Sequence, residues 1–254
     1  MPASNPRAIE KARALDVDMV ILDLEDSVRE EDKEAAREAA RSAAPFAGKL
    51  FAIRVNRADG EHHERDLQAV AESAAGHVVV PKVESPATAT HASRAAGRPA
   101  LAMIETPAGV LAAAAIAAAP GAAGLIAGTN DLAAQLRLPP GTGRASMALS
   151  LQLVVLAARA GGGWAIDGVF NALADPEGLA RECAEGRALG FDGKSLIHPG
   201  QVDIARAAFS AGETELAEAH ALIAAATGGA ERYGDRMIET MDVDRARALI
   251  ERAR

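Results

Sequence analysis

Short apolar runs alternate with longer helical patterns through the first 200 residues of the chain. Each run is nearly continuous in apolar residues, as expected of a parallel strand that is buried on both faces. Alternation of such runs with helical patterns is typical of repeated βα units. The predicted strands lie within Met19–Asp26, Leu50–Asn56, His77–Val83, Ala100–Thr106, Gly124–Asp131, Ala165–Phe170 and Gly193–His198.

The helical patterns between these runs include Glu30–Ala44, His62–Ala75, Ala108–Ala119, Ala145–Ala160 and Asp175–Leu189. Seven strands within about 180 residues favour an α/β fold of the TIM (β/α)8 barrel type over an open doubly wound sheet. The first predicted strand also lacks the G-x-G-x-x-G fingerprint that would favour the open sheet.

The barrel pattern stops after Gly200, which predicts two parts. Residues 1–200 form the barrel, and residues 201–254 form a helical C-terminal extension that packs as a lid on the barrel or on a neighbouring subunit. Within this extension we expect helices at Gln201–Phe209 and Glu213–Ala226, a flexible break at Thr227–Gly229, and a last helix from about Asp242.

Composition narrows the class of protein. Alanine makes up about a quarter of the chain and aromatic residues 3%, which suits close helix packing. A net charge of −8 argues against a nucleic-acid or anionic-membrane surface. The single cysteine, Cys183, excludes a disulfide framework and a cysteine zinc cluster. No apolar run has the length of a membrane span, so we expect a soluble cytoplasmic protein.

Polar side chains recur at the ends of the predicted strands. In a barrel, the carboxyl ends of all strands meet at one mouth, where barrel active sites are built. One or two polar strand ends would mean little, but the same placement across seven strands favours a functional mouth. These residues are Asp23, Glu25, Asp26, Arg54, Asn56, Lys82, Glu84, Glu105, Asn130, Asp131, Asp167, Lys194 and His198.

Glu105 and Asp131 end consecutive strands, so we expect them to lie side by side at this mouth. Two carboxylates with few other protein ligands suit Mg²⁺, which takes one or two carboxylates together with water and substrate oxygens. The absence of a His-x-x-x-His or thiolate set beside them disfavours zinc. Spacing alone does not separate this magnesium site from a pair of solvated loop carboxylates.

The cations at the strand ends have two interpretations each. Arg54 fits a substrate carboxylate through its planar, bidentate guanidinium, whereas an exposed salt bridge is the alternative. Lys82 and Lys194 stand out because the chain has five lysines and 22 arginines. Either lysine has the chemistry to form a Schiff base. We prefer ion pairing with the cluster formed by Asp23, Glu25 and Asp26.

The histidines give weaker signals. His198, in the sequence IHPGQ, is either a catalytic base or a residue that shapes a turn. His62 and His63 are expected to be solvent-exposed residues at the start of a helix.

Seven ordered blocks of the sequence resemble the citrate lyase beta-subunit/malyl-CoA lyase family of the HpcH/HpaI aldolase group. The similarity covers essentially the whole chain. The blocks are DMVILDLEDSV, AIRVN, VVVPKVES, IETPAGV, GLIAGTNDLA, AIDGVFNALADPEGLARE and LGFDGKSLIHPGQV.

This resemblance implies a TIM barrel that binds Mg²⁺ through Glu105 and Asp131, with Arg54 holding the substrate carboxylate. Lys82 and Asn130, together with Glu105, are expected to contact the substrate. The implied reaction is cleavage or formation of a carbon–carbon bond in a 3-hydroxyacyl-CoA such as malyl-CoA, citramalyl-CoA or a citryl thioester. Its products or substrates are a 2-oxo or related carbonyl acid and an acyl-CoA, and the implied assembly is a homotrimer or hexamer.

Two departures from the family pattern stand out. The lid aspartate of the family, in a G-x-M-V-D-x-P pattern, falls here on Glu239, and Met241 replaces the proline. We therefore expect Glu239 to be the catalytic acid or base, with Asp242 as the alternative if the register slips. The family's first barrel strand is almost absent from this sequence, so we expect that strand to be truncated.

Three other functions remain open from the sequence. One is a CoA-independent aldolase acting on small 2-oxo acids. The second, from the resemblance to this family, is acyl-CoA thioesterase or malate synthase side activity. The third is a catalytically weak homologue that serves in binding or assembly. Retention of Arg54, Glu105 and Asp131 argues against the weak homologue, whereas the altered lid and the truncated strand favour it.

Overall fold

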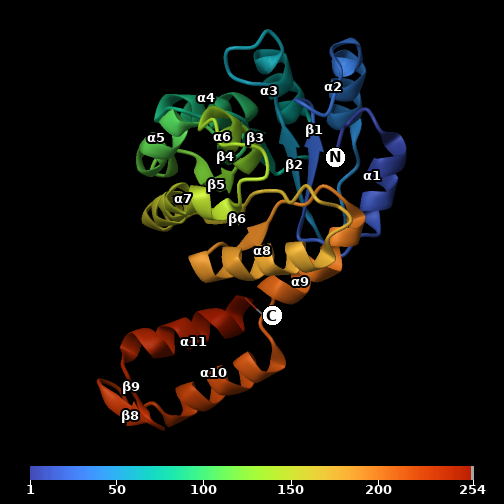
Figure 1. Cartoon of the computed structure of the whole chain (residues 1–254). Helices are drawn as coiled ribbons and strands as arrows, with labels where there is room; N and C mark the ends of the chain where they lie inside the picture. The colour runs from blue at the N-terminus through green and yellow to red at the C-terminus, as the bar shows by residue number, and fades with distance from the viewer. Residues whose placement is uncertain (253–254) are drawn as a thin grey trace. The chain divides into compact units, whose positions relative to one another are not determined.

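The computed structural model describes residues 1–252 and shows a curled sheet of parallel strands (Figure 1). The seven strands of this sheet are hydrogen-bonded in sequence order from β1 to β7. Their bounds are β1 Met19–Asp23, β2 Leu50–Arg54, β3 His77–Val80, β4 Ala100–Ile104, β5 Ala122–Ala127, β6 Trp164–Asp167 and β7 Gly193–Lys194. Each overlaps one of the predicted runs, so all seven predicted strands are present. Their bounds differ, because β5 and β6 begin two and one residues before their runs, and every strand ends before its run does. The last three residues of the run Gly124–Asp131 are helical rather than extended.

One helix precedes the first strand, and the others follow the strands around the curled sheet (Figure 1). Their bounds are α1 Pro6–Arg13, α2 Lys33–Ser42, α3 His63–Glu72, α4 Pro86–Ala96, α5 Pro107–Ala117, α6 Thr129–Gln135, α7 Ala148–Gly161 and α8 Pro176–Leu189, with 3-10 turns η1 Glu30–Asp32, η2 Arg144–Met147 and η3 Pro199–Gln201. Ser85, Thr106 and Asp175 cap the N-termini of α4, α5 and α8, each followed by a proline in the first turn.

Helix α4 was not among the predicted helices, and its burial explains why. Its buried face consists of Ala89, Ala92 and Ala96. Alanine recurs throughout this chain, so a stripe of alanines at helical spacing does not stand out from its surroundings as a stripe of leucines would.

The barrel prediction is confirmed in part. The α/β architecture and the parallel, curled sheet are those of a TIM-barrel-type fold, but the sheet is a seven-stranded half-barrel with β1 and β7 as its end strands. Residues 1–3 lie alongside β1, where Asp23 N–H donates to the Met1 carbonyl (2.8 Å) and Ala3 N–H donates to the Asp23 carbonyl (2.9 Å). They form one parallel bridge, Pro2 to Asp23. The truncation of a first strand stays a prediction.

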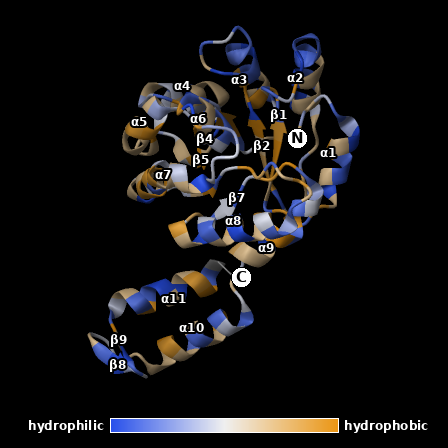
Figure 2. Cartoon of the chain, in the orientation of Figure 1, coloured by the Kyte–Doolittle hydropathy of each residue, from blue (hydrophilic) through white to orange (hydrophobic). Residues whose placement is uncertain are grey.

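One apolar cluster of the sheet consists of residues that are in register across neighbouring strands. Ala52 lies opposite Ile21 and Leu101 opposite Val79. Ile126 lies opposite both Met103 and Ile166. These side chains form one apolar cluster, and Figure 2 shows hydrophobic residues along β1 and β2. The cluster fixes the strand register and therefore the positions at which the strands end.

The chain divides into two compact units, Met1–Ala205 and the residues from Arg206 onward. Helix α9, Val202–Phe209, crosses this boundary. The second unit contains α10 Glu213–Ala225, a hairpin of β8 Glu231–Tyr233 and β9 Arg236–Ile238, and α11 Thr240–Arg252. Its core is Ala219, Leu222, Ile238 and Ala246.

The hairpin corrects the sequence interpretation of this unit, which predicted helices and a flexible break only. Its strands have three residues each, and only Ile238 of the six is fully buried. Strands this short and exposed have no apolar alternation for a sequence pattern to detect.

Among the described residues, no helix is long and apolar enough to cross a membrane.

Candidate active site

The predicted polar residues do gather at the carboxyl ends of the strands. Asp23 and Arg54 are the last residues of β1 and β2, and Glu105 directly follows β4. Asp167 and Lys194 are the last residues of β6 and β7. The structure divides these residues into two clusters, one at β1–β5 and one at β6–β7.

The first cluster begins with a bidentate ion pair between neighbouring strand ends. Asp23 and Arg54 are register partners, with Arg54 Nε 2.6 Å from Asp23 Oδ1 and Nη2 2.6 Å from Oδ2. Burial of Asp23 favours its neutral form, but the hydrogen bond and charge of Arg54, together with Ser27, outweigh burial and lower its pKa to about 2. The pair therefore stays ionised and fixes the orientation of the guanidinium.

Glu25 lies between two cations. Its Oε2 is 2.9 Å from Arg54 Nη1, and its Oε1 accepts a hydrogen bond from Lys82 Nζ at 2.8 Å. Lys82 Nζ also lies 3.8 Å from Asp26. The ion-pair interpretation of Lys82 is confirmed by these contacts. Burial nevertheless raises the pKa of Glu25, and the two cations only partly offset it.

Glu105 is held in place by backbone rather than by a cation. The Lys82 N–H donates to Glu105 Oε1 at 2.8 Å, and Lys82 adopts a left-handed backbone with φ +51°. On its other side, a Cβ at Gly128 would lie 2.3 Å from Glu105 Cβ and 2.3 Å from its Oε2. Only glycine at position 128 leaves room for the carboxylate, so this side chain is set in a close-fitting cradle.

The surroundings of the Glu105 carboxylate disfavour its ionised form. Glu105 is 2% exposed, and burial, together with the charges of Glu25 and Asp131, raises its pKa to about 7. The hydrogen bond from Lys82 N–H offsets only part of this increase. A buried carboxylate close to two other carboxylates is a site that a bound cation would stabilise.

Asp131 and Asn130 stand in the first turn of α6, which follows β5. Asp131 is half-buried and its charge acts on both Glu105 and Lys82, as expected of two carboxylates at neighbouring strand ends. Asn130 is exposed and exchanges hydrogen bonds with Asn171, at 2.6 and 3.3 Å. The oxygen donors of Glu105 and Asp131 fit Mg²⁺ in number and in chemistry.

Lys33 supports the loop after β1 and was missed by the sequence interpretation. Its buried ammonium donates to the carbonyls of Leu24 (2.7 Å) and Glu25 (2.8 Å) and to Asn56 Oδ1 (2.7 Å). It therefore positions the backbone that carries Glu25. The only available signal was the scarcity of lysine, because the pairing joins residues from three elements.

Comparison with known proteins identifies the family of this chain. The model of the HpcH/HpaI aldolase/citrate lyase family matches residues 1–199. The chain belongs to this family. A second family model, for C–C bond lyases of the TIM-barrel fold, matches residues 145–254.

Three relatives of this lyase family span almost the whole chain. A (3S)-malyl-CoA thioesterase of Cereibacter sphaeroides is 41% identical and covers 100% of this chain and 92% of its own. A citrate lyase subunit beta-like protein of Mycobacterium tuberculosis is 36% identical, with 99% and 93% coverage. The crystal structure of CitE from Mycobacterium tuberculosis, in complex with magnesium, acetoacetate and coenzyme A, has a TM-score of 0.87 and 35% identity, with 100% and 96% coverage.

The second cluster of this HpcH/HpaI-family chain lies at β6 and β7. Lys194 Nζ, which is fully buried, contacts Asp167 Oδ2 at 3.1 Å and Glu182 Oε1 at 2.7 Å. Arg144 Nη2 contacts Asp167 Oδ1 at 2.8 Å. Lys194 therefore forms ion pairs, which is the role that we preferred from the sequence. Its partners, however, are not the predicted Asp23, Glu25 and Asp26.

The predictions for the three histidines have different outcomes in the structure. His198 caps η3, where its Nδ1 accepts a hydrogen bond from Gly200 N–H at 3.1 Å, so its turn-shaping role holds. His63 does begin α3, but it is 2% exposed, and His62 is half-buried. The expectation that both are solvent-exposed was wrong, because the first turn of α3 faces α4 and the loop after β2.

Glu239 belongs to the second unit. It is exposed, between β9 and α11, and its N–H donates to Asp242 Oδ2 at 2.9 Å. All residues of the first cluster belong to the barrel unit, whereas Glu239 belongs to the second unit. A catalytic role of Glu239 at that cluster therefore stays a prediction.

Proposed function

We propose that this member of the HpcH/HpaI family is a Mg²⁺-dependent lyase that cleaves or forms the carbon–carbon bond of a 3-hydroxyacyl-CoA such as malyl-CoA. The observation that carries the proposal is the buried Glu105, with its raised pKa, beside Asp131 and within one cluster with the fixed guanidinium of Arg54. This arrangement joins a cation site to a carboxylate-binding group. The two together recognise a 2-hydroxy or 2-oxo acid.

In this proposal Glu105 and Asp131 hold the magnesium ion. When bound, Mg²⁺ supplies Lewis-acid polarisation of the oxygens of the acid. The fit rests on the close cradle at Gly128, the oxygen donors and the concentration of negative charge. Lys82 serves the site twice, because its N–H orients Glu105 and its ammonium neutralises Glu25.

Arg54 is assigned to the carboxylate of the substrate. Asp23 holds Nε and Nη2, so the guanidinium cannot rotate. Nη1 faces Glu25 at 2.9 Å and Met103 Sδ at 3.9 Å. A substrate carboxylate that binds Nη1 would share this nitrogen with Glu25. The ammonium of Lys82 would continue to neutralise the negative charge of Glu25. We also assign substrate contacts to Lys82 and Asn130.

The cleavage breaks the C2–C3 bond of the 3-hydroxyacyl chain. This bond joins the carbon next to the thioester to the carbon that carries the hydroxyl group. The hydroxyl group loses its proton and becomes the carbonyl of the released acid, and the bonding electron pair passes to the carbon next to the thioester. That enolate then takes up a proton to give the acyl-CoA. We assign both proton transfers to Glu239, supplied by the C-terminal extension of a neighbouring subunit in a homotrimer or hexamer. Its carboxylate takes the hydroxyl proton, and the resulting carboxylic acid gives a proton to the enolate carbon.

Hydrolysis of the thioester is a second candidate activity, favoured by one observation. The (3S)-malyl-CoA thioesterase of Cereibacter sphaeroides is 41% identical to this chain. Hydrolysis breaks the carbon–sulfur bond instead, with water as the co-reactant, and yields malate and free CoA. The same anchoring of the acid by Arg54 serves both reactions, so binding does not separate them.

Incubation with (3S)-malyl-CoA and Mg²⁺ separates the candidates by their products. The lyase yields glyoxylate and acetyl-CoA, with glyoxylate detected as its phenylhydrazone and no free thiol released. The thioesterase releases free CoA thiol and malate. Glu105→Gln is expected to lower turnover by a factor of about a hundred or more, and the matched surface variant Glu177→Gln, whose side chain is 89% exposed, is expected to leave turnover unchanged.

Three outcomes would contradict the lyase proposal. Free thiol without glyoxylate identifies the thioesterase. Cleavage of a hydroxy-oxo acid that lacks CoA, with no turnover of CoA thioesters, identifies the CoA-independent aldolase. A panel of malyl-, citramalyl- and citryl-CoA with no turnover, and no stabilisation by CoA thioesters with Mg²⁺, identifies a catalytically weak homologue.

A further inference from the structure

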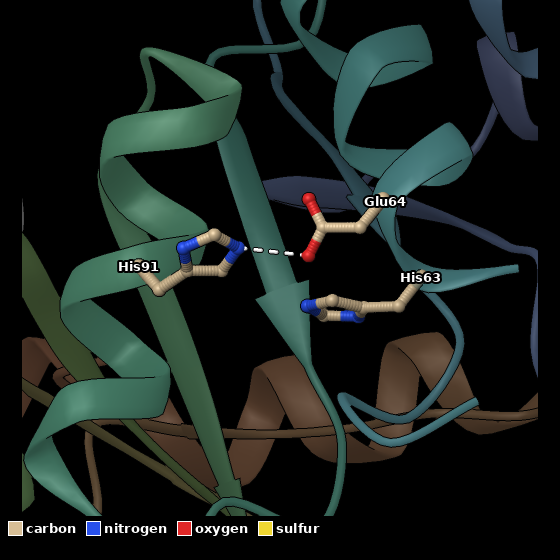
Figure 3. A group of neighbouring side chains, drawn as sticks. All are labelled: His63, Glu64 and His91. Carbon is tan, nitrogen blue, oxygen red and sulfur yellow. Dashed lines mark hydrogen bonds and ion pairs between the residues drawn. The ribbon is translucent and has the colours of Figure 1, made fainter. Parts of the chain in front are cut away.

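A separate group of side chains with metal-ligating atoms lies between α3 and α4, outside the first cluster at the ends of β1–β5, which we call the strand-end cluster. His63 and Glu64 occupy the first turn of α3, and His91 belongs to α4 (Figure 3). One ligand atom from each of these three residues lies within 4.8 Å of the other two. The imidazole rings of His63 and His91 are stacked, with centroids 6.4 Å apart.

His63 is the decisive member because it is buried and one of its nitrogens has no partner. Its side chain is 2% exposed, and Nδ1 lies 2.7 Å from the Asn56 carbonyl oxygen. A carbonyl can only accept, so Nδ1 carries the proton and Nε2 of the neutral ring presents a lone pair. Nε2 is buried and has no hydrogen-bond partner, although a buried polar atom normally has one.

This arrangement is that of an oriented metal ligand. Metal-binding histidines characteristically donate their second ring N–H to a carbonyl or carboxylate, which fixes the tautomer and the ring direction. Figure 3 shows the other ring nitrogen of His63 on the side of Glu64 and His91. The lone pair of Nε2 therefore points toward the two remaining donors.

Glu64 and His91 are able to adjust to an ion. They already meet, with His91 Nε2 2.8 Å from Glu64 Oε1, and their side chains are 68% and 55% exposed. Tetrahedral coordination at bond lengths near 2.1 Å separates ligand atoms by about 3.4 Å. Small rotations of two exposed side chains toward a fixed His63 would give that separation.

We propose that His63, Glu64 and His91 form a Zn²⁺ site. Two imidazole nitrogens and one carboxylate oxygen are a donor set that zinc prefers, with a fourth position left for water. Magnesium prefers oxygen ligands and would not compete here. The bound ion would link α3 to α4 and give His63 Nε2 the partner that it lacks.

Titration of Zn²⁺ into the full chain by calorimetry, with Mg²⁺ in large excess, tests the site. We expect one Zn²⁺ per chain and a rise in melting temperature on binding. His91→Ala and Glu64→Gln change exposed positions, so they are expected to fold, and each is expected to weaken binding by about a hundredfold. The matched control His220→Ala, at an exposed histidine of the second unit, is expected to bind like the wild type.

Substitution with Co²⁺ adds a spectroscopic measurement that does not depend on activity. A four-coordinate cobalt ion gives an intense visible absorption, which His91→Ala should abolish and Glu105→Gln should retain. The proposal is overturned if the wild type binds no Zn²⁺, or if His91→Ala binds it as tightly as the wild type. Loss of zinc in Glu105→Gln, or its displacement by Mg²⁺, would place the ion at the strand-end cluster and also overturn the proposal.

Discussion

At the scale of single residues, the pKa of Glu105 gives the proposed magnesium site a defined pH dependence. Burial and the charges of Glu25 and Asp131 raise that pKa to about 7 in the metal-free chain. Protons therefore compete with Mg²⁺ below pH 7, and the apparent affinity should fall by about tenfold from pH 8 to pH 6.

Calorimetry at the two pH values, in buffers of different ionisation enthalpy, measures both the affinity and the proton released. Glu105→Gln should bind Mg²⁺ weakly and lose the pH dependence. Equal wild-type affinity at pH 6 and pH 8 would rule out Glu105 as a ligand that must lose a proton.

The pKa of Asp23, which is shifted in the opposite direction, predicts a second pH dependence, that of the free energy of unfolding. Its folded-state pKa of about 2 lies below the ordinary value of 3.8. The pair with Arg54 therefore stabilises the fold above pH 4, and this contribution, about 2 kcal/mol, is lost as the pH falls from about 4 to 2. Asp23→Asn removes the bidentate partner of Arg54 and leaves Glu25 at Nη1, and it should lower the free energy of unfolding at pH 7 by about 3 kcal/mol.

Urea unfolding of the wild type and Asp23→Asn between pH 7 and pH 2.5 tests this prediction. The difference between the two proteins should shrink as the pH falls below 4. Asp59→Asn, at an exposed aspartate paired with Arg57, should show no measurable difference at any pH. A constant difference for Asp23→Asn would mean that the ionised pair is not its cause.

At the scale of elements, the turn from β5 into α6 forms one wall of the site through Gly128. A methyl group there would lie 2.3 Å from two atoms of Glu105, although the backbone at φ −101° accepts alanine. Gly128→Ala should therefore displace the carboxylate and weaken Mg²⁺ binding by at least about tenfold, while overpacking lowers stability by about 1–3 kcal/mol.

The matched substitution is Gly143→Ala, where a Cβ meets nothing within 4 Å and φ is −68°. It should change neither Mg²⁺ affinity nor melting temperature by a measurable amount. Unchanged Mg²⁺ affinity in Gly128→Ala would show that the close approach to Glu105 does not define the metal site.

The packing of strands and helices determines which features of the fold and of the site the sequence could predict. The approximate positions of the strand ends were predictable, because apolar runs mark the strands and parallel strands align their ends, as Asp23 and Arg54 show. Each strand nevertheless stops two to four residues before its predicted run ends. Lys33 was not, because its partners come from the loops after β1 and β2. The burial of His63 was not either, since it depends on the packing of α3 against α4.

At the scale of the whole molecule, the proposal divides one active site between two subunits. Glu105 lies in the barrel unit and Glu239 in the second unit. Glu105→Gln and Glu239→Gln should each be inactive alone if both groups are required. In mixed oligomers, however, a barrel from one variant can receive the lid of the other and regain both groups.

Random mixing of equal amounts fixes the size of the recovery. A complete site needs a barrel from Glu239→Gln and a neighbouring lid from Glu105→Gln, so about a quarter of the sites in a cyclic homotrimer should be active. Co-expression with two different tags, purification of the mixed oligomer and assay of lyase turnover measure this fraction. The matched control pairs Glu239→Gln with the double variant Glu105→Gln/Glu239→Gln, which supplies no intact lid and should recover nothing. Absence of recovery in the first mixture, with mixed oligomers present, would mean that each chain completes its own site, because a lid acting within its own subunit leaves every barrel in that mixture short of one group.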